Sequence, residues 1–207
     1  MEKEELISNL INDGYLKTAA IIDAFRAADR KDFIPEELKS RAYENIALLI
    51  GSRQTISQPL VVAFMLELLD LKPGEKLLEI GTGSGWNTAL MAKIVGEGGK
   101  ICSMERIAEL YNFAKINLAK YQFVGQGIVE LILGDGSIGY KEQAPFDKII
   151  AAAAGDEIPV EWKEQLKIGG RIVAPVKDSI MVVNKLTRDN FEQKEYFGFS
   201  FVPLVKG

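Results

Sequence analysis

The sequence predicts an α/β fold: a doubly wound, mostly parallel sheet with a helical N-terminal extension and an antiparallel C-terminal edge. From residue 75 onward, short apolar segments alternate with segments of helical periodicity, as in a parallel sheet covered by helices. The polar turn 187–190 follows the first of the last two strand-like segments, and so short a connection favours antiparallel pairing. A length of 207 residues suits one such domain with a full core.

Residues 1–70 are predicted to be helical. Apolar side chains recur at helical spacing around 6–11 and again around 21–25. The segment 32–35 interrupts this pattern, because the residue before Pro35 is pushed out of the helical region. A further helix is predicted from Pro59 to about Leu69, since proline is favoured at the first helical position and Lys72-Pro73-Gly74 would end it.

From residue 75, strands and helices follow in turn. Each predicted strand is short and apolar, and each predicted helix carries apolar side chains at helical spacing. Strands are predicted at 76–80, 100–104, 129–133, 146–151 and 171–176, and helices at 86–95, 107–121 and 160–166. The antiparallel pair is predicted at 180–186 and 196–202.

Composition excludes several classes of protein. With 25 Lys+Arg against 29 Asp+Glu the net charge is −4, and the pI near 5.1 argues against nucleic-acid binding, which needs clustered cations. No apolar run approaches the roughly 20 residues that cross a bilayer. The acidic start Met1–Glu5 lacks the features of a signal peptide. We therefore expect a cytoplasmic protein that binds neither membrane nor nucleic acid.

The chain contains no histidine and a single cysteine, Cys102. Without histidine there is no Ser-His-Asp triad, no Cys-His dyad and no imidazole base. These counts also argue against a transition-metal site, so no metal is expected. Any chemistry must run on carboxylates, hydroxyls, amines, backbone dipoles or a cofactor that brings its own reactivity.

A glycine-rich segment, Glu79-Ile80-Gly81-Thr82-Gly83-Ser84-Gly85, joins the first predicted strand of the sheet to its helix. Such a turn lets backbone N–H groups approach a ligand, although it can equally be a connection that binds nothing. Glu105 at the end of the second strand could bind two ribose hydroxyls, and Gly134-Asp135-Gly136 closes the third strand. Three such features at one edge of one sheet favour a nucleoside site.

The glycine spacing narrows the kind of cofactor. A dinucleotide fingerprint would have glycine or alanine where this chain has Trp86, and no P-loop lysine follows. The pattern resembles the first motif of class I S-adenosylmethionine-dependent methyltransferases, which implies their Rossmann-like fold, with S-adenosylmethionine as cofactor and S-adenosylhomocysteine as product. The resemblance implies cofactor contacts from Glu79, Gly81, Thr82, Gly83, Gly85, Glu105, Arg106, Asp135 and Gly136.

The segment 50–59, upstream of the glycine motif, has two interpretations. Ser57 could simply cap the helix that begins with Pro59. The segment also closely resembles the Gly-x-x-Gln-Thr-Ile-Ser-x-Pro signature of protein-L-isoaspartate O-methyltransferases. That resemblance extends from about residue 20 to 205 and includes the motifs at 78–85, 104–107, 134–136, 145–147, 151–153, 158–159, 165–171, 175–176 and 201–204.

This resemblance implies methylation of the α-carboxylate of L-isoaspartyl residues in damaged proteins or peptides, after which the ester collapses to a succinimide. Ser57 would touch the reacting carboxylate, and Gln54, Thr55 and Ile56 would hold the isoaspartyl unit. One domain, 1–207, is expected, acting as a monomer. In it, residues 1–74 would form the extension and substrate loop and residues 75–207 the cofactor-binding core.

The sequence departs from the family pattern at two positions near these motifs. Family members commonly have histidine after the signature proline, where this chain has Leu60, and tyrosine after the glycine motif, where it has Trp86. Two alternative functions stay open on sequence alone. One is a related methyltransferase acting on another carboxylate, such as an aspartate in a modified peptide. The other is a non-catalytic module that binds S-adenosylmethionine.

Overall fold

The computed structural model describes residues 1–204, so the last three residues of the predicted 75–207 core lie outside the described residues. The extension comprises α1 (Lys3–Asn12), α2 (Ala19–Ala27), the 3₁₀ turns η1 (Arg30–Phe33) and η2 (Glu36–Arg41), the strands β1 (Leu48–Gly51) and β2 (Gln54–Ile56), and α3 (Pro59–Leu69). The core helices and turns are α4 (Trp86–Val95), α5 (Ala108–Ala119), η3 (Gly136–Ile138), η4 (Lys141–Gln143) and α6 (Val160–Gln165). The core strands are β3 (Lys76–Ile80), β4 (Lys100–Glu105), β5 (Val129–Leu133), β6 (Phe146–Ala151), β7 (Leu166–Val176), β8 (Ser179–Lys185) and β9 (Phe191–Phe197).

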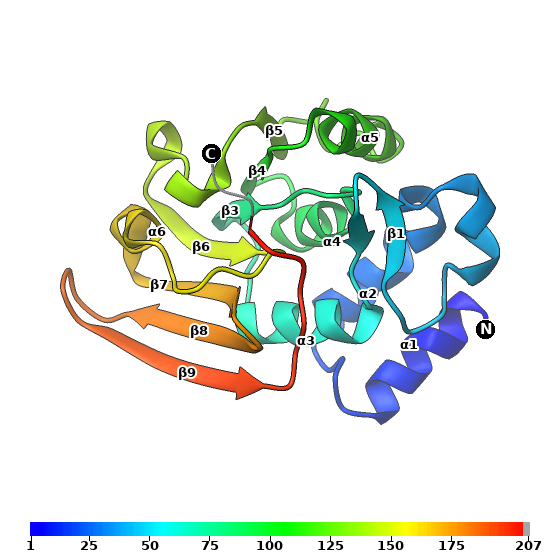
Figure 1. Cartoon of the computed structure of the whole chain (residues 1–207), viewed down its shortest axis with the longest axis horizontal. Helices are drawn as coiled ribbons and strands as arrows, with labels where there is room; N and C mark the ends of the chain where they lie inside the picture. The colour runs from blue at the N-terminus through cyan, green and yellow to red at the C-terminus, as the bar shows by residue number, and fades with distance from the viewer. Residues whose placement is uncertain (205–207) are drawn as a thin grey trace.

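The core is one seven-stranded sheet in the order β5-β4-β3-β6-β7-β8-β9. The pairs from β5 to β7 are parallel, and β8 and β9 continue the sheet as an antiparallel edge. The order reverses at β3, as in a doubly wound fold, and ligands bind beyond the carboxyl ends of the strands at such a point. Figure 1 shows the sheet running from β5 to β9, with the extension to one side.

Helices cover both faces of the sheet because its central strands are apolar on both sides. Leu77 packs with α3, α4 and α5 in one hydrophobic cluster, and its neighbour Leu78 packs with Trp162 of α6 in the other. The extension belongs to the first cluster, since α2 packs on α4 and α3 lies against β7 and β8. Within residues 1–204, no helix is both long and apolar enough to cross a membrane.

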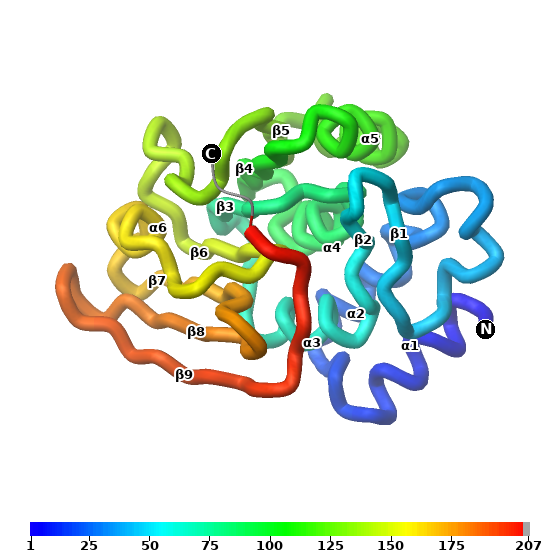
Figure 2. The backbone as a smooth tube through the Cα atoms, viewed as in Figure 1, coloured from blue at the N-terminus to red at the C-terminus, as the bar shows by residue number. Residues whose placement is uncertain are grey.

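The prediction that residues 1–70 are helical is wrong for 48–56, which form the antiparallel hairpin β1–β2. Burial alternates along β1, where Leu48 and Ile50 are buried and Leu49 is 65% exposed. Alternation of this kind is the pattern of a strand with one face covered, and the apolar run hid it. Figure 2 traces this hairpin out in front of the start of α4.

Two strands also differ from the predictions by more than one residue. The last strand is β9, at 191–197 instead of 196–202, because the short turn after β8 sets the register Lys185↔Phe191. Residues 198–204 instead cross in front of the sheet toward β3 (Figure 1). β7 begins at Leu166, before the predicted 171, because Leu166 already pairs with Phe146 of β6, and the register then shifts before Lys148 pairs with Arg171.

Candidate active site

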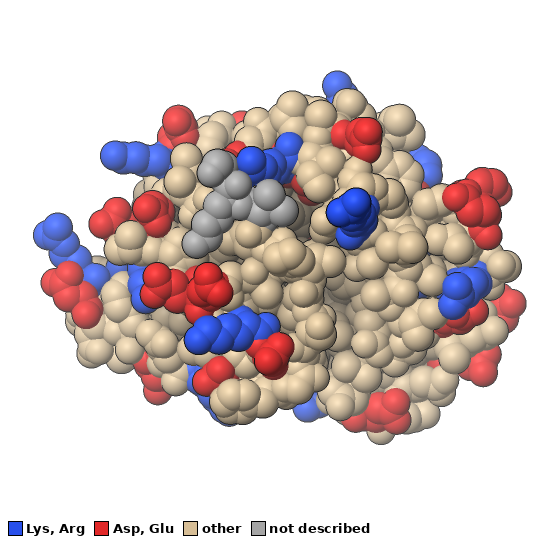
Figure 3. Space-filling model, in the orientation of Figure 1, with Lys and Arg blue, Asp and Glu red and all other residues tan. Residues whose placement is uncertain are grey.

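A cavity of about 400 Å³ lies beyond the carboxyl ends of β3, β4, β5 and β6. This volume falls in the range of about 300–1,000 Å³ that is usual for small-molecule sites. The hairpin β1–β2 and the C-terminal segment 200–204 form its outer walls. Figure 3 looks onto the face that the C-terminal segment crosses: an uncharged groove runs down the middle, with charged side chains to its left and one basic side chain beside its upper end.

The glycine turn after β3 forms the floor of the cavity at one end. Gly81, Gly83 and Gly85 have φ angles of +89°, +57° and +88°, which side-chain-bearing residues adopt only with strain. Gly85 also packs so closely on α5 that a Cβ would lie 3.1 Å from the Leu118 side chain. The backbone therefore turns sharply at the cavity edge and enters α4 at Trp86.

Glu105 at the end of β4 lies next to this turn and lines the cavity. Its Oε2 accepts a hydrogen bond from the Gly83 N–H at 2.8 Å, and its Oε1 accepts one from the Ile107 N–H at 2.9 Å. Each carboxylate oxygen has a second lone pair, so both can still accept a hydrogen bond from a ligand. The carboxylate thus both fixes the glycine turn and faces the cavity.

Glu79 lies beneath the turn and is fully buried. Its carboxylate accepts hydrogen bonds from the hydroxyls of Ser103 and Thr88 at 2.6 and 2.5 Å and from the Asn87 amide at 3.0 Å. Ser103 reaches it because the two residues are paired across β3 and β4. Burial, aided by the charge of Glu105, raises the pKa of Glu79 to about 7 despite these three donors.

The hairpin β1–β2 brings the second group of predicted residues to the cavity. Its turn residues Ser52 and Arg53 have φ angles of +47° and +59°, and the Ser52 hydroxyl donates a 2.5 Å hydrogen bond to Glu109 of α5. Ile50 of the hairpin lies against the glycine turn, with its Cδ1 3.7 Å from where a Gly83 Cβ would be. The hairpin is therefore attached to the core at its tip and packed on the glycine turn.

Ser57 does not cap the following helix. Gln58 is the N-cap residue of α3, and no side chain makes a cap hydrogen bond there. Across residues 1–204 the Ser57 hydroxyl has no partner in the protein, yet Ser57 lines the cavity. The interpretation of Ser57 as a helix cap is therefore wrong, and its hydroxyl is available to a ligand.

The C-terminal segment forms a wall that the sequence analysis assigned to a strand. The Ala154 N–H donates to the Val202 carbonyl, and the Leu204 N–H donates to the Ala154 carbonyl, both at 2.8 Å. These bonds hold Phe201 and its neighbours across the end of β6, where the small residues Ala152 and Ala153 leave room for the cavity. The run of alanines at a strand end was the one signal in the sequence for this close approach.

The structure brings most of the predicted site residues to the same cavity and leaves a few outside its lining. The predicted residues that line it are Gln54, Thr55, Ile56, Ser57, Gly81, Thr82, Gly83, Glu105, Arg106 and Gly136. Glu79 and Gly85 lie behind the glycine turn, and Asp135 lies beside Arg106, 3.6 Å from its Nη1. Leu60 is also outside the lining; its N–H donates to the Asn45 side chain.

Two solved structures share this fold over all or nearly all of the chain. One, described as a protein-L-isoaspartate O-methyltransferase from Plasmodium falciparum in complex with S-adenosyl-L-homocysteine, superposes with a TM-score of 0.91 at 23% identity and covers all of both chains. A second, a protein-L-isoaspartate O-methyltransferase, gives a TM-score of 0.87 at 30% identity over 98% of this chain and 65% of that chain. The strand order and these superpositions therefore define the fold as the α/β, Rossmann-like fold of methyltransferases.

Sequence comparison narrows this class to a family. The family model for protein-L-isoaspartate(D-aspartate) O-methyltransferase matches residues 1–207. The protein-L-isoaspartate O-methyltransferase of Ignicoccus hospitalis is 42% identical over 99% of this chain and 98% of its own length. That of Methanothrix thermoacetophila is 44% identical over 99% and 95%. The chain belongs to the protein-L-isoaspartate(D-aspartate) O-methyltransferase family.

The raised pKa of Glu79 predicts a pH-dependent stability. Because the folded-state pKa of about 7 exceeds the ordinary 4.5, folding favours the protonated carboxyl. Its contribution is complete below about pH 4.5 and is lost as the pH rises through 7. From pH 4.5 to pH 8, the free energy of unfolding should therefore fall by roughly 2–3 kcal/mol more in the wild type than in Glu79→Gln.

Urea unfolding of both proteins at several pH values, without cofactor, measures this difference. The chain has no histidine, so few other groups titrate in this window. Stability curves of the two proteins that run parallel from pH 4.5 to pH 8 would contradict the assignment.

Proposed function

We propose that this protein transfers the methyl group of S-adenosylmethionine to the α-carboxylate of L-isoaspartyl residues in damaged proteins or peptides, and so starts repair through a succinimide. The observation that carries the proposal is the single cavity that joins the glycine turn and Glu105 to the Gln54–Ser57 segment. One end offers a nucleoside site, and the other offers hydroxyl, amide and backbone groups. Membership of the family supports the same reaction.

The residues at the glycine-turn end fit S-adenosylmethionine. Glu105 presents carboxylate oxygens to the cavity, as two ribose hydroxyls require. The glycine backbone and Thr82 would surround the methionine moiety, and Gly134 and Gly136 leave space for the adenine. Among the described residues that line the cavity, the only cation is Arg106. The lining therefore suits a cofactor without phosphates better than a dinucleotide.

The bound cofactor supplies an electrophilic methyl group on a sulfonium. The chain's own task is positioning, because a carboxylate is already ionised near neutral pH and needs no general base. Gln54, Thr55 and Ile56 would hold the isoaspartyl backbone, and the Ser57 hydroxyl would donate a hydrogen bond to the reacting carboxylate. The hairpin and the C-terminal segment would exclude water from the line of transfer.

Three of the predicted cofactor residues lie outside the cavity lining and would support the cofactor site without contacting the cofactor: Glu79, Gly85 and Asp135. Glu79 would hold the turn from below through Ser103 and Thr88, and Gly85 would allow it to pack on α5. Asp135 would act together with Arg106 at the end of β5. Leu60 lies outside the lining, so we expect the departure from the family histidine to affect α3 more than the acceptor.

We propose further that the protein acts as a monomer in the cytoplasm, on isoaspartyl-containing proteins and peptides and not on nucleic acid. The cavity is lined on both sides by one chain, which supports a monomer. The net charge of −4 supports the exclusion of nucleic acid. We also propose that residues 1–74 and 75–207 act as one domain, which the hydrophobic cluster shared by both parts supports.

Glu105→Ala should weaken S-adenosylmethionine binding. The loss of a charged hydrogen-bond acceptor is worth about 1.5–3 kcal/mol, or roughly 10- to 150-fold in affinity. Glu105→Gln keeps one acceptor and should lose less. Calorimetric titration measures the three affinities, with the exposed Glu97→Ala as control. Wild-type affinity in a folded Glu105→Ala protein would remove Glu105 from the cofactor site.

Ser57→Ala should lower turnover while leaving the fold intact. Because Ser57 makes no cap bond, the free energy of unfolding should change by less than about 0.5 kcal/mol. We expect kcat to fall at least ~10-fold, since the hydroxyl helps to align the acceptor, and cofactor affinity to stay at its wild-type value. Steady-state kinetics and calorimetry measure this, with the exposed Ser40→Ala as control. Equal kcat in wild type and variant would leave Ser57 without a catalytic role.

The acceptor preference provides the most direct test. An isoaspartyl linkage inserts a methylene into the main chain and leaves an α-carboxylate beside it, whereas an aspartyl carboxylate stands out on a side chain. A misplacement of about 1 Å can cost on the order of 100-fold in rate, so an isoaspartyl peptide should be methylated at least ~100-fold faster than its aspartyl twin.

Mass spectrometry of ester formation on the two peptides measures this preference. Similar rates, or ester on the aspartyl peptide alone, would favour a methyltransferase for another carboxylate. Cofactor binding with no ester on either peptide would favour a non-catalytic module.

A further inference from the structure

Arg30 on η1 is a buried cation that lies outside the cavity lining. Its side chain is 2% exposed, and its guanidinium donates only to backbone carbonyls. Nη1 donates to Ala42 and Glu44 at 2.7 and 3.3 Å, and Nη2 donates to Ile46 and Ser57 at 2.9 and 3.0 Å. Burial lowers the pKa of Arg30 to about 10, so the group is still charged at neutral pH.

The two carbonyls that share Nη2 stand at the two ends of the substrate-side hairpin. Ile46 precedes β1 and Ser57 follows β2, so one nitrogen joins the chain on both sides of 48–56. An isolated two-stranded hairpin is marginally stable in water, and this hairpin pairs only with itself. Its base is therefore held by Arg30, and its tip is held by the Ser52–Glu109 hydrogen bond.

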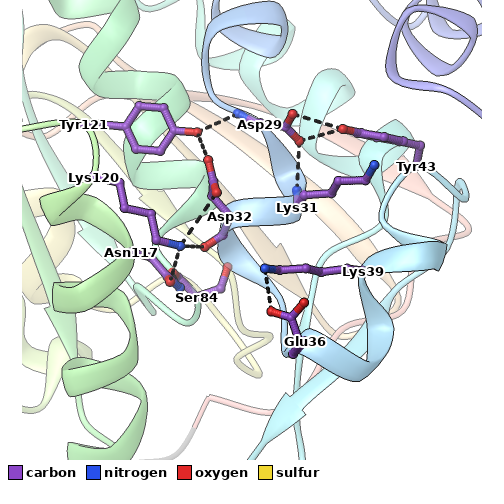
Figure 4. Close-up of polar contacts among 10 residues, drawn as sticks. All are labelled: Asp29, Lys31, Asp32, Glu36, Lys39, Tyr43, Ser84, Asn117, Lys120 and Tyr121. Carbon is purple, nitrogen blue, oxygen red and sulfur yellow. Dashed lines mark hydrogen bonds and ion pairs between the residues drawn. The ribbon is translucent and has the colours of Figure 1, made fainter.

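The turn that carries Arg30 is itself fixed by a polar network (Figure 4). The Tyr121 hydroxyl donates to Asp32 at 2.7 Å and accepts from the Asp29 N–H at 2.9 Å. The Tyr43 hydroxyl donates to the Asp29 carboxylate at 2.8 Å, and Lys120 Nζ donates to the Asp32 carbonyl at 2.7 Å. η1 is thus held from both sides, and Arg30 has little freedom to follow a moving hairpin.

On its other side Arg30 packs on Trp86, the first residue of α4. Its guanidinium lies over the Trp86 ring, 5.3 Å from the ring centre. Trp86 has two further contacts, a hydrogen bond from its Nε1 to the Ala28 carbonyl at 3.1 Å and an edge contact with Phe25. Trp86 therefore keeps its place without Arg30, whereas the Ser57 carbonyl has no other side-chain donor within residues 1–204.

We propose that Arg30 is a positioning residue for the methyl transfer: by holding the Ser57 and Ile46 carbonyls, it sets where the Ser57 hydroxyl and the acceptor segment 54–57 stand. This inference rests on the proposed function, because it assigns the alignment of the acceptor to a residue that never touches it. A planar guanidinium can span four carbonyls, but the point charge of a lysine cannot. Arginine is thus required at this position, not merely a cation.

Arg30→Lys tests the proposal, with Arg41→Lys, an exposed arginine of the same extension, as the matched control. We expect kcat on an isoaspartyl peptide to fall at least ~10-fold in Arg30→Lys. Cofactor affinity by calorimetry should stay at the wild-type value, because Trp86 keeps its other anchors. Amide hydrogen exchange at residues 46–58 should become faster without any methyl acceptor present. Arg41→Lys should match the wild type in all three measurements.

Three results would overturn the proposal: wild-type kcat in Arg30→Lys, a fall in kcat that tracks an equal fall in cofactor affinity, or unchanged exchange at 46–58. Ile7→Val, a mild change at a buried residue of α1, controls for a general loss of stability. This variant should be less stable than the wild type but should keep the wild-type kcat per folded molecule. If Arg30→Lys does not fold, amide hydrogen exchange in the wild-type protein tests whether the hairpin is held. Slow exchange at the paired residues Leu48 and Ile56 supports the clamp, and exchange as fast as in a free hairpin contradicts it.

Failure of this inference and failure of the proposed function are distinguishable. A wild-type protein that esterifies no isoaspartyl peptide would contradict the proposed function. The exchange measurement would still report whether Arg30 holds the hairpin, because it needs neither acceptor nor turnover.

Discussion

Parallel strands present all their carboxyl ends at one edge of a sheet, and this constraint governs the rest of the molecule. The glycine turn, Glu105, Gly134 with Gly136, and Ala152 each lie at the end of a different strand, yet they meet in one cavity. The sheet closes that cavity from one side only. The other walls must come from segments outside the parallel strands. The hairpin β1–β2 and the segment 200–204 form these walls.

Two glutamates at neighbouring strands show how burial separates chemical roles in a chain without histidine. Glu79 is fully buried among three donors, and its pKa is raised to about 7. Glu105 is 6% exposed, accepts hydrogen bonds from two backbone N–H groups and faces the cavity. The first supports the turn from below and the second is offered to a ligand. Neither position calls for a general base, which agrees with a reaction whose acceptor is already ionised.

The sequence predicted the parallel part of the sheet because its central strands β3, β4 and β6 are short apolar runs buried on both faces, with a helix pattern between the strands. It predicted that the glycine turn and Glu105 would meet at one edge of the sheet for the same reason, since both lie at strand ends. It failed at the hairpin and at β9, where pairing between strands decides the conformation and local propensity does not. Nothing in the local pattern marks Arg30, whose four partners are backbone carbonyls spread over residues 42–57.

The hairpin and the C-terminal segment, which we propose form the acceptor side of the cavity, are attached to the sheet but lie outside its main hydrogen-bonded ladder. The hairpin pairs only with itself, and the segment 200–204 contacts the sheet region through Ala154 beyond the end of β6. Length and sequence can therefore change in these two segments while the strand register that forms the cofactor end stays intact. If these two segments bind the acceptor as proposed, a change in acceptor preference needs no change in the parallel sheet.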